Sequence, residues 1–117
     1  MTMSRDGSAA PDDRIVEVRT TFPDRDSAAA CAERLIRDRV AACVQVDGPV
    51  ASIYAWRAAI ERAEEWRCTC KTTPARAAAC REAILAGHPY EIPELIEVVV
   101  SGSPAYAAWV RAGVGDG

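Results

Sequence analysis

Alternating and helical patterns of apolar residues divide the first part of the chain into predicted strands and a helix. Apolar and polar positions alternate over RIVEVRTTF (14–22), which predicts a strand that Pro23 ends. Asp24 or Asp26 can then cap a helix, because a carboxylate at this position accepts the free N–H groups of the first turn. The apolar positions of this helix, at helical spacing, are Ala28, Ala32, Leu35, Ile36 and Val40.

The middle of the chain predicts a long, interrupted strand and its partner. AACVQV (41–46) has strand character, DGP (47–49) indicates a turn or bulge, and VASIYAWRAAI (50–60) is again rich in β-forming residues. We expect the hairpin connection at ERAEE (61–65), although this segment contains no glycine. WRCTCKTT (66–73) then returns as the partner strand.

Two further helices and one strand are predicted in the last third. Thr73 followed by Pro74 is typical of an N-cap and a first helical residue, and Gly87 ends this helix. Its buried stripe is Ala77, Cys80 and Ile84. LIEVVVS (95–101) predicts the final strand, and SPAYAAWVRAGV (103–114) predicts a short C-terminal helix with Pro104 near its start.

The order β-α-β-β-α-β-α indicates an α+β fold, a ferredoxin-like sandwich with an antiparallel sheet, an extended β-hairpin and a short C-terminal helix. We expect one domain over residues 14–114, a flexible tail over 1–13 and a short C-terminal tail over 115–117. Both sides of the long hairpin carry large apolar residues, such as Ile53 and Trp56, and two helices on one face cannot cover both. A second copy of the chain is therefore the expected cover.

Composition excludes several classes of function. The 117 residues are half apolar with a net charge of −3, and no basic stripe is present that could follow a nucleic-acid backbone. The longest strongly apolar run, LIEVVV, contains a glutamate and is too short to span a bilayer. Residues 1–13 lack the apolar run of a signal peptide, so we expect a soluble, cytoplasmic protein without a nucleic-acid or membrane partner.

The cysteines indicate a reduced, structural role. Five are present, an odd number with no CxxC pair: Cys31, Cys43, Cys68, Cys70 and Cys80. Cys68 and Cys70 are two apart on a predicted strand and so point to the same face, where two thiols can hold a soft metal. Cysteine is also a common small core residue, and we favour that interpretation.

The motifs of the chain resemble those of the CutA family, the divalent-cation tolerance proteins. The resemblance runs from about Val16 to Val114. It rests on TTFPDRDSA, RVAACVQV, SIYAW, KTT, HPYEIPE and GSPAYAAW in this order, with almost no gaps in spacing. It implies a ferredoxin-like subunit in a tight homotrimer, with the long hairpins pairing around the three-fold axis. It also implies a role in tolerance of copper and other divalent cations, with no reaction and no obligatory cofactor attached.

Three positions depart from the family's pattern. A cysteine near the end of the first strand, implicated in copper binding in some members, is Thr20 here. The histidine of the HPY motif is present as His88, whereas a histidine that precedes it in some members is Gly87. The usual WEGK or WKGK after the hairpin tyrosine is Trp56-Arg57-Ala58-Ala59, so a glycine is lost.

The HPYEIPE segment (88–94) is the first candidate for chemistry. It holds the only histidine, and imidazole is a suitable ligand for Cu or Zn, to which Glu91 or Glu94 can add oxygen. No HxH or HxxxH spacing supports a tight site, so we expect weak metal binding at His88. The favoured alternative is that His88 hydrogen-bonds the backbone in a connector stiffened by Pro89 and Pro93.

A pocket between subunits is the second candidate. If the fold is as the resemblance implies, hairpin residues approach the connector of the same or an adjacent chain. The candidate ligand-binding residues are Tyr54, Trp56, Lys71, His88, Tyr90 and Glu94. Such a set suits an anionic or aromatic small molecule, with His88 or Glu94 as proton-transfer group. Tyrosine and tryptophan are also common at permanent interfaces, and Lys71 can simply end a strand in water.

The predicted function is that of a CutA-like homotrimer in the response to or tolerance of divalent metal ions such as copper. A trimer recruited to bind or transform a small molecule is the alternative, and an assembly module is a third interpretation. No nucleophile elbow or Walker motif is present, so catalysis is disfavoured. Cu or Zn is the candidate ion, and further copies of the chain, a metal ion or a small molecule are the expected partners.

Overall fold

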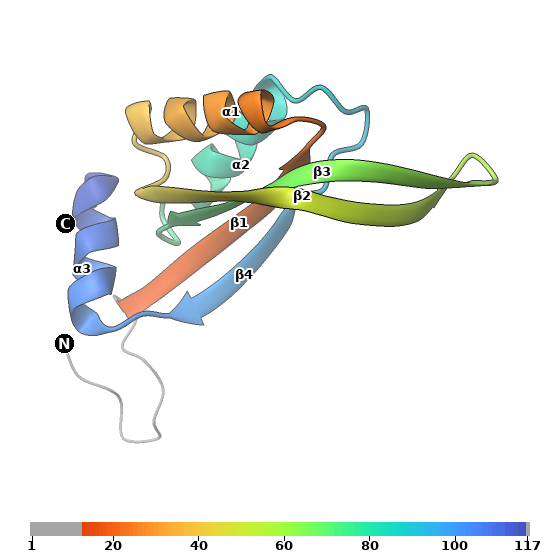
Figure 1. Ribbon diagram of the computed structural model, residues 1–117. Helices are drawn as coiled ribbons and strands as arrows, with labels where there is room; N and C mark the ends of the chain where they lie inside the picture. The colour runs from red at the N-terminus through yellow and green to blue at the C-terminus, as the bar shows by residue number, and fades with distance from the viewer. Residues whose placement is uncertain (1–12, 117) are drawn as a thin grey trace.

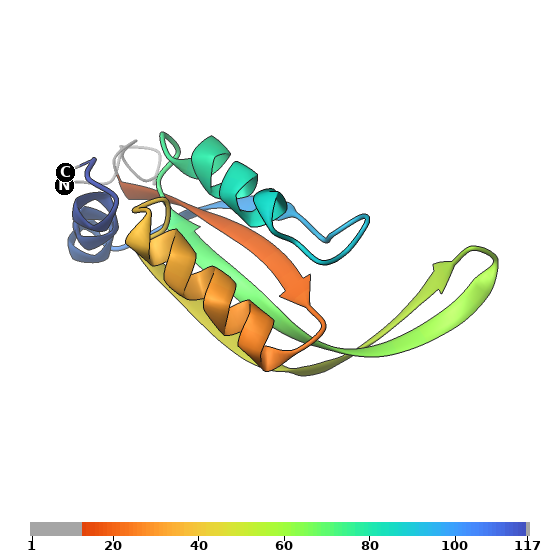
Figure 2. The same ribbon diagram turned by 90° about the horizontal axis from the view of Figure 1, so that it is seen from above.

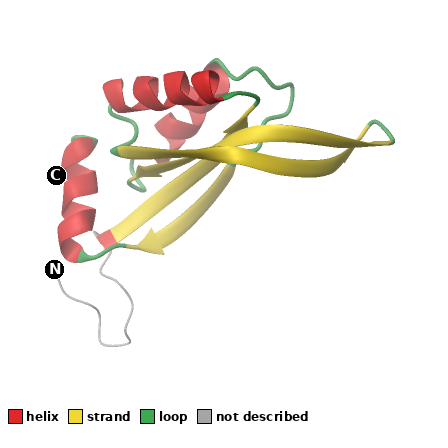
Figure 3. Cartoon of the chain, viewed as in Figure 1, coloured by secondary structure: helices red, strands yellow, loops and turns green. Residues whose placement is uncertain are grey.

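The computed structural model describes residues 13–116. Its elements are coloured by type in Figure 3 and labelled in Figure 1. In chain order they are β1 (Arg14–Phe22), α1 (Arg25–Arg37), β2 (Cys43–Trp56), β3 (Ala59–Thr72), α2 (Ala77–Ala86), β4 (Ile96–Ser101) and α3 (Pro104–Gly113). The predicted order of elements is thereby confirmed. Most of the predicted tails, residues 1–12 and 117, lies outside the described residues.

The four strands form one antiparallel sheet in the order β2-β3-β1-β4. Helices α1 and α2 lie over the same face of this sheet, and α3 stands at the end of the sheet away from the hairpin (Figures 1 and 2). This arrangement confirms the ferredoxin-like sandwich. Asp13, which we assigned to the N-terminal tail, is only 1% exposed, and its carbonyl accepts the Gly102 N–H at 2.9 Å.

The main core fills the space between the sheet and the two helices. Val16 and Val18 of β1, Leu35 of α1 and Ile84 of α2 are at most 2% exposed there. Cys31, Cys68, Cys70 and Cys80 belong to the same core and are free thiols. The interpretation of Cys68 and Cys70 as core residues is therefore confirmed. A hydrogen bond to Cys80 and burial together raise the pKa of Cys70, which keeps it a thiol at neutral pH.

The helix starts follow capping chemistry. Asp24 caps α1, since its Oδ1 accepts the Ser27 N–H at 2.7 Å. The predicted start of α2 at Thr73 is wrong: residues 74–76 form a turn in which Thr73 Oγ1 accepts the Arg76 N–H at 3.3 Å, and the helix begins at Ala77. The predicted stripe of Ala77, Cys80 and Ile84 is buried as expected.

The hairpin β2–β3 turns at Arg57-Ala58, not at residues 61–65 as we predicted from the sequence. Both turn residues have positive φ, 51° for Arg57 and 68° for Ala58. Two-residue hairpin turns require this left-handed backbone, because it matches the twist of the flanking strands. The error has a physical origin: Arg-Ala is a poor turn sequence, whereas the polar run 61–65 resembles a loop but is an exposed stretch of β3.

A bulge divides β2, because the register shifts between Asp47 and Val50. The predicted interruption at residues 47–49 is confirmed. Beyond the bulge the hairpin projects past the rest of the domain (Figures 1 and 2). The chain measures 50 × 32 × 21 Å as a result. Ile53 and Ile60, on this projecting part, are 60% and 77% exposed.

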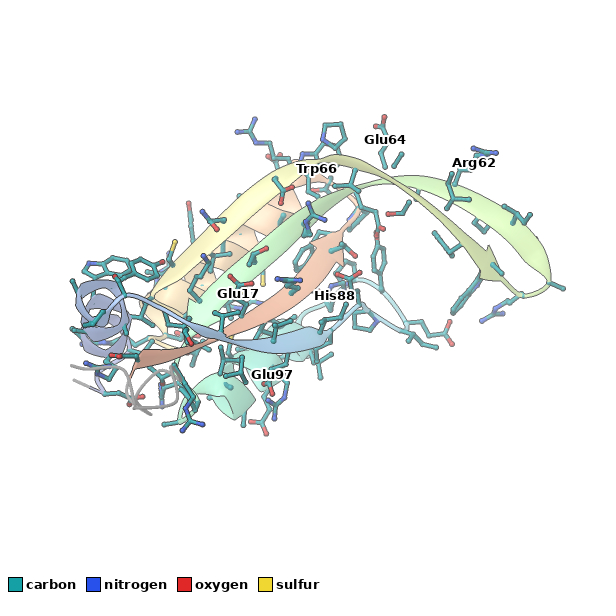
Figure 4. All side chains as sticks on the ribbon, turned by 90° about the horizontal axis from the view of Figure 1, so that it is seen from below. Glu17, Arg62, Glu64, Trp66, His88 and Glu97 are labelled. Atoms are coloured by element: carbon teal, nitrogen blue, oxygen red, sulfur yellow. The ribbon has the colours of Figure 1, made fainter. Side chains whose placement is uncertain are left out.

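The second face of the sheet is covered only at one end. There, Ile15 packs against Ala107 and Val110 of α3. The rest of this face carries ion pairs between neighbouring strands, including Lys71 Nζ to Glu17 Oε2 at 3.5 Å and Arg67 to Asp47 at 2.8 Å. Figure 4 views the molecule from this side, with Glu17 near the middle of the sheet. Within residues 13–116, no helix is long and apolar enough to cross a membrane.

Candidate functional site

A pocket of about 500 Å³ lies between the projecting hairpin and the segment that joins α2 to β4. Three parts of the chain build it: the end of β1, the hairpin, and the connector at residues 90–94. The lining residues are Thr21, Ser52, Ile53, Tyr54, Trp56, Glu65, Tyr90, Glu91, Ile92 and Glu94. Four of the six candidate ligand-binding residues, Tyr54, Trp56, Tyr90 and Glu94, are thus brought together within one chain.

The two-residue period of a strand explains which hairpin side chains enter this pocket. Ser52, Tyr54 and Trp56 occupy alternate positions of β2, so their side chains share one face. Glu65 of β3 pairs with Val50 and lies on the same face. We call this the inner face of the hairpin. Tyr54 and Trp56 are 45% and 36% exposed, which leaves their rings accessible to a ligand.

Glu65 is the buried polar centre of the site, with 9% of its surface exposed. Burial alone raises the pKa of its carboxyl group. Hydrogen bonds from the side chains of Ser52, Tyr90 and Thr21 outweigh that effect and hold the pKa below its ordinary value. Glu65 is therefore an ionised carboxylate at neutral pH.

Tyr90 connects the hairpin to the connector. Its phenol donates a hydrogen bond of 2.8 Å to Glu65 Oε2. Burial and the neighbouring carboxylate raise the pKa of Tyr90 far above its ordinary value, because both disfavour a phenolate. The phenol therefore remains a hydrogen-bond donor throughout the physiological pH range.

His88 lies behind Tyr90 and does not line the pocket. Its ring stacks on Phe22 with centroids 4.5 Å apart, and the Tyr90 ring is 5.2 Å away. Nδ1 accepts the Tyr90 N–H at 3.2 Å, so Nε2 must carry the proton, which it can donate to Thr20 Oγ1 at 3.1 Å. Figure 4 shows His88 at the end of the sheet nearest the hairpin.

This environment favours the neutral imidazole. Burial lowers the pKa of His88, and contacts with the Thr21 backbone and Glu65 offset only part of that effect. Both ring nitrogens are engaged in hydrogen bonds. The hydrogen bond to the Tyr90 backbone is the arrangement that we expected for a histidine that fixes the connector.

Thr20, the residue in place of the expected family cysteine, is fully buried and contacts His88 directly. The two positions that the resemblance associates with copper are therefore neighbours in this fold. Here they form a hydroxyl–imidazole hydrogen bond in place of a thiol–imidazole pair. Among residues 13–116, no group of three or more histidine, cysteine, aspartate or glutamate side chains is placed to hold a metal ion.

Lys71 does not join the pocket within one chain. It lies opposite Glu17 and Cys43 in the sheet, and its ammonium nitrogen is 6.0 Å from the centre of the Tyr106 ring. The pocket lining consequently contains three carboxylates, those of Glu65, Glu91 and Glu94, and no lysine or arginine. This acidic lining differs from the one that we expected for an anionic ligand.

Sequence reasoning missed Glu65, Ser52 and Thr21. Glu65 was hidden because it falls in the segment 61–65, which we assigned to the hairpin connection. With the turn at residues 57–58, the strand register places Glu65 next to Val50 and on the face of Tyr54. The alternation of side chains along β3 therefore does place Glu65 on the face of Tyr54, but only when the turn is assigned to residues 57–58.

Comparison with known proteins identifies one family. The family model described as CutA1 divalent ion tolerance protein matches residues 16–113. A probable divalent-cation tolerance protein cutA homologue from Encephalitozoon cuniculi is 35% identical over 104 residues, which cover 88% of this chain and 90% of that protein. The CutA of Thermus thermophilus is 31% identical over 99 residues, covering 84% and 96% of the two chains.

Solved structures show the same fold. The crystal structure of CutA from Xylella fastidiosa superimposes with a TM-score of 0.83 at 34% identity, covering 86% of this chain and 97% of the other. The solved divalent cation tolerance protein of Thermus thermophilus gives a TM-score of 0.80 at 30% identity, with 85% and 97% covered. A protein from Archaeoglobus fulgidus, named as a periplasmic divalent cation tolerance protein, gives 0.82 at 28% identity, with 86% and 98% covered.

Proposed function

Because the chain belongs to the CutA1 divalent ion tolerance protein family, we propose that it is a homotrimer that contributes to tolerance of divalent metal ions such as copper. The projecting hairpin is the observation that carries the proposal. Ile53 and Ile60 are 60% and 77% exposed at its tip, so no other residue between positions 13 and 116 covers them fully. Further copies of the same chain would bury this apolar surface.

The outer face of the hairpin, opposite the inner face, suits contact with another copy. On β2, Ala51, Ile53 and Ala55 alternate with Ser52, Tyr54 and Trp56, and Ile53 also borders the pocket. Ile60, Arg62 and Glu64 are their partners on β3, and Figure 4 labels the two charged ones. Arg62 and Glu64 have opposite charges, so two outer faces can pair without leaving an uncompensated charge.

The sheet edges favour a closed ring. Strands β2 and β4 form the two edges of the sheet, and each has one side that pairs with no strand of the described chain. An edge strand can add a strand from another chain. Contact between the β2 edge of one copy and the β4 edge of the next is heterologous, and such contacts close into a ring when the rotation permits. Three copies are the number that the family resemblance implies.

Analytical ultracentrifugation tests the assembly. The wild-type protein should sediment at micromolar concentration with three times the 12.6 kDa mass of the chain. Ile60→Asp should dissociate it, because a carboxylate would replace an apolar contact. Leu85→Asp on α2 changes a side chain that is 47% exposed and outside the hairpin, so it should leave the trimer intact. A well-folded monomer of the wild type would contradict the proposal.

Metal tolerance in this proposal involves weak metal binding. His88 is poorly placed to contribute, because a Cu²⁺ or Zn²⁺ ion would gain a nitrogen ligand from it only after this residue releases Thr20 or the Tyr90 N–H. Growth of a deletion strain in copper-containing medium tests the physiological role. The wild-type gene should restore growth, and the Ile60→Asp variant should not if the trimer is the active form. Equal growth with and without the wild-type gene would contradict it.

We also propose the cytoplasm as the compartment, on the basis of the thiols. All five cysteines are free, and four of them are buried in the core. A reducing compartment keeps such thiols unpaired. The Archaeoglobus fulgidus relative is named as periplasmic, so cell fractionation of the native host is the appropriate test. Recovery in the periplasmic fraction would contradict the assignment.

Binding of a small molecule is a second candidate function, and the pocket of about 500 Å³ is the observation that favours it. Aromatic walls and a few fixed polar groups are typical of ligand sites of this size. The ionised Glu65 can accept a proton, but nothing in the site indicates a nucleophile, so we favour binding over catalysis. A thermal-shift screen of metabolites tests this function, since a bound ligand raises the melting temperature.

A further inference from the structure

The lining of the pocket combines two kinds of group that recognise organic cations. Tyr54, Trp56 and Tyr90 provide aromatic surface, and Glu65 and Glu94 provide carboxylates. The faces of aromatic rings attract ammonium and guanidinium groups, while carboxylates pair with them through charge-assisted hydrogen bonds. An anionic ligand would meet only negative charge in this lining.

No lysine or arginine of the pocket lining neutralises Glu65 or Glu94. The hydroxyl groups of Ser52, Tyr90 and Thr21 that hydrogen-bond Glu65 carry no positive charge. Arg67 is the cation whose charge interacts with Glu94, but its guanidinium is engaged by Asp47 through bonds of 2.8 and 3.3 Å. The pocket therefore has a surplus of negative charge in a half-buried setting.

Arg57 of the hairpin turn already interacts with the mouth of this pocket as a cation would. Its Nη2 lies 3.1 Å from Glu91 Oε2, and its guanidinium carbon is 5.3 Å from the centre of the Trp56 ring. The side chains of Arg57 and Glu91 are 72% and 69% exposed, so this ion pair is weak and a ligand can displace it. The combination of aromatic ring and carboxylate thus accepts a guanidinium group within the molecule itself.

We propose that this pocket binds a small organic cation, an ammonium or guanidinium compound with an apolar body. The cationic group lies near Glu94 and Glu65, and the apolar body packs on Trp56 and Tyr54. The inference rests on the second candidate function, a small-molecule site, and specifies the class of its ligand. It is compatible with the trimer, because assembly mainly uses the outer face of the hairpin and the pocket mainly uses the inner face, with Ile53 at the border of the two.

Four probes of similar shape separate charge from shape. Benzylamine and benzamidine carry a positive charge, benzyl alcohol is neutral, and benzoate is negative. NMR of the ¹⁵N-labelled trimer reports binding through the indole N–H signals of the three tryptophans. Of these, Trp56 lines the pocket, whereas Trp66 and Trp109 do not and serve as internal references. We expect the two cations to shift the Trp56 signal saturably and to bind about tenfold tighter than benzyl alcohol.

Three variants locate the cation. Glu94→Gln should weaken benzylamine binding about fivefold without affecting benzyl alcohol, since it removes a charge but little volume. Glu82→Gln changes an exposed carboxylate of α2 outside the pocket and should have no effect. Arg57→Gln should strengthen benzylamine binding about threefold, because it frees Glu91 and Trp56 from the internal cation.

Different results would contradict the small-molecule function and the preference for cations. If none of the four probes shifts the Trp56 signal while the protein remains a folded trimer, the small-molecule function itself is wrong. If benzyl alcohol or benzoate binds as tightly as benzylamine, a pocket exists but its preference for cations is wrong. Equal effects of Glu94→Gln and Glu82→Gln would likewise overturn the assignment of the cation to this site.

Discussion

The phenol of Tyr90 donates a 2.8 Å hydrogen bond to the carboxylate of Glu65, and this bond ties the connector between α2 and β4 to the base of the hairpin. The two residues are 25 positions apart in the sequence. Glu65 is ionised and only 9% exposed, so the loss of this donor would leave a poorly solvated charge. The connector consequently depends on the hairpin for its position.

Tyr90→Phe should lower the free energy of unfolding by about 1.5–3 kcal/mol, because it removes one hydrogen bond to a charged group and leaves the ring in place. Thermal or urea unfolding at a fixed protein concentration measures this loss. Tyr54→Phe removes a phenol that is 45% exposed in the same pocket and should change stability by much less. Equal losses of unfolding free energy in both variants would show that the Tyr90–Glu65 hydrogen bond does not stabilise the protein more than an exposed phenol does.

The only histidine should titrate below its ordinary pKa. Burial lowers the pKa of His88 from 6.5, so the unfolded chain takes up a proton at a higher pH than the folded chain. The stability that the neutral ring provides is present above about pH 6.5 and is lost as the pH falls through the folded pKa. The imidazole Cε1–H signal measures that pKa directly, and a value at or above 6.5 would refute this account.

A variant extends the same test to stability. His88→Gln removes the titrating group, so the decline in unfolding free energy between about pH 7.5 and about pH 5.5 should be smaller than in the wild type. Glu65 does not obscure this interval, since its lowered pKa places its protonation at more acidic pH. An identical decline in both proteins would mean that other groups cause it.

Ala58→Gly should stabilise the protein by about 0.5–1 kcal/mol, because Ala58 has a φ of 68° and glycine adopts this backbone without a steric penalty. Ala59→Gly provides the matched control. Ala59 is an exposed strand residue of β3 that pairs with Trp56 and lies outside the outer face, and glycine there only adds conformational entropy to the unfolded chain. Unfolding by urea should therefore show opposite signs for the two variants, and a loss at both positions would argue against strain at Ala58.

Metal binding should not depend on His88. Both ring nitrogens are hydrogen-bonded, and the described residues place no group of three ligands around an ion. Calorimetric titration with Cu²⁺ and Zn²⁺ should give the same weak binding for the wild type and for His88→Ala. A loss of affinity of about tenfold or more in the variant would show that His88 is a ligand after all.

The pattern of apolar residues was sufficient to predict the fold. Alternation over residues 14–22 and the stripe of Ala77, Cys80 and Ile84 each specify a buried face, and burial of such faces dominates folding. The helix start at Thr73 failed because a threonine followed by proline can cap a turn as well as a helix. Ile36, which we predicted as one of the apolar positions of the first helix, is 41% exposed.

The site was less predictable than the fold. Tyr54, Trp56, Tyr90 and Glu94 stood out by residue type and do meet in one pocket. Lys71 could not be placed, because its position depends on strand register, which pairs it with Glu17 at a distance from the pocket. Glu65 was missed because the turn at Arg57-Ala58 lacks the residues that usually indicate one. The turn of a hairpin determines which residues of its two strands pair and share a face. The local composition around Glu65 does not reveal where that turn lies.

The inner and outer faces of the hairpin constrain how its length can vary. Side chains of a strand change face with every residue, so the insertion of one residue between the bulge at Asp47–Val50 and the turn would exchange the two sets. Tyr54 and Trp56 would then point away from the inner face. Between the bulge and Tyr54, only an even number of added residues therefore keeps the two faces in place without a further bulge.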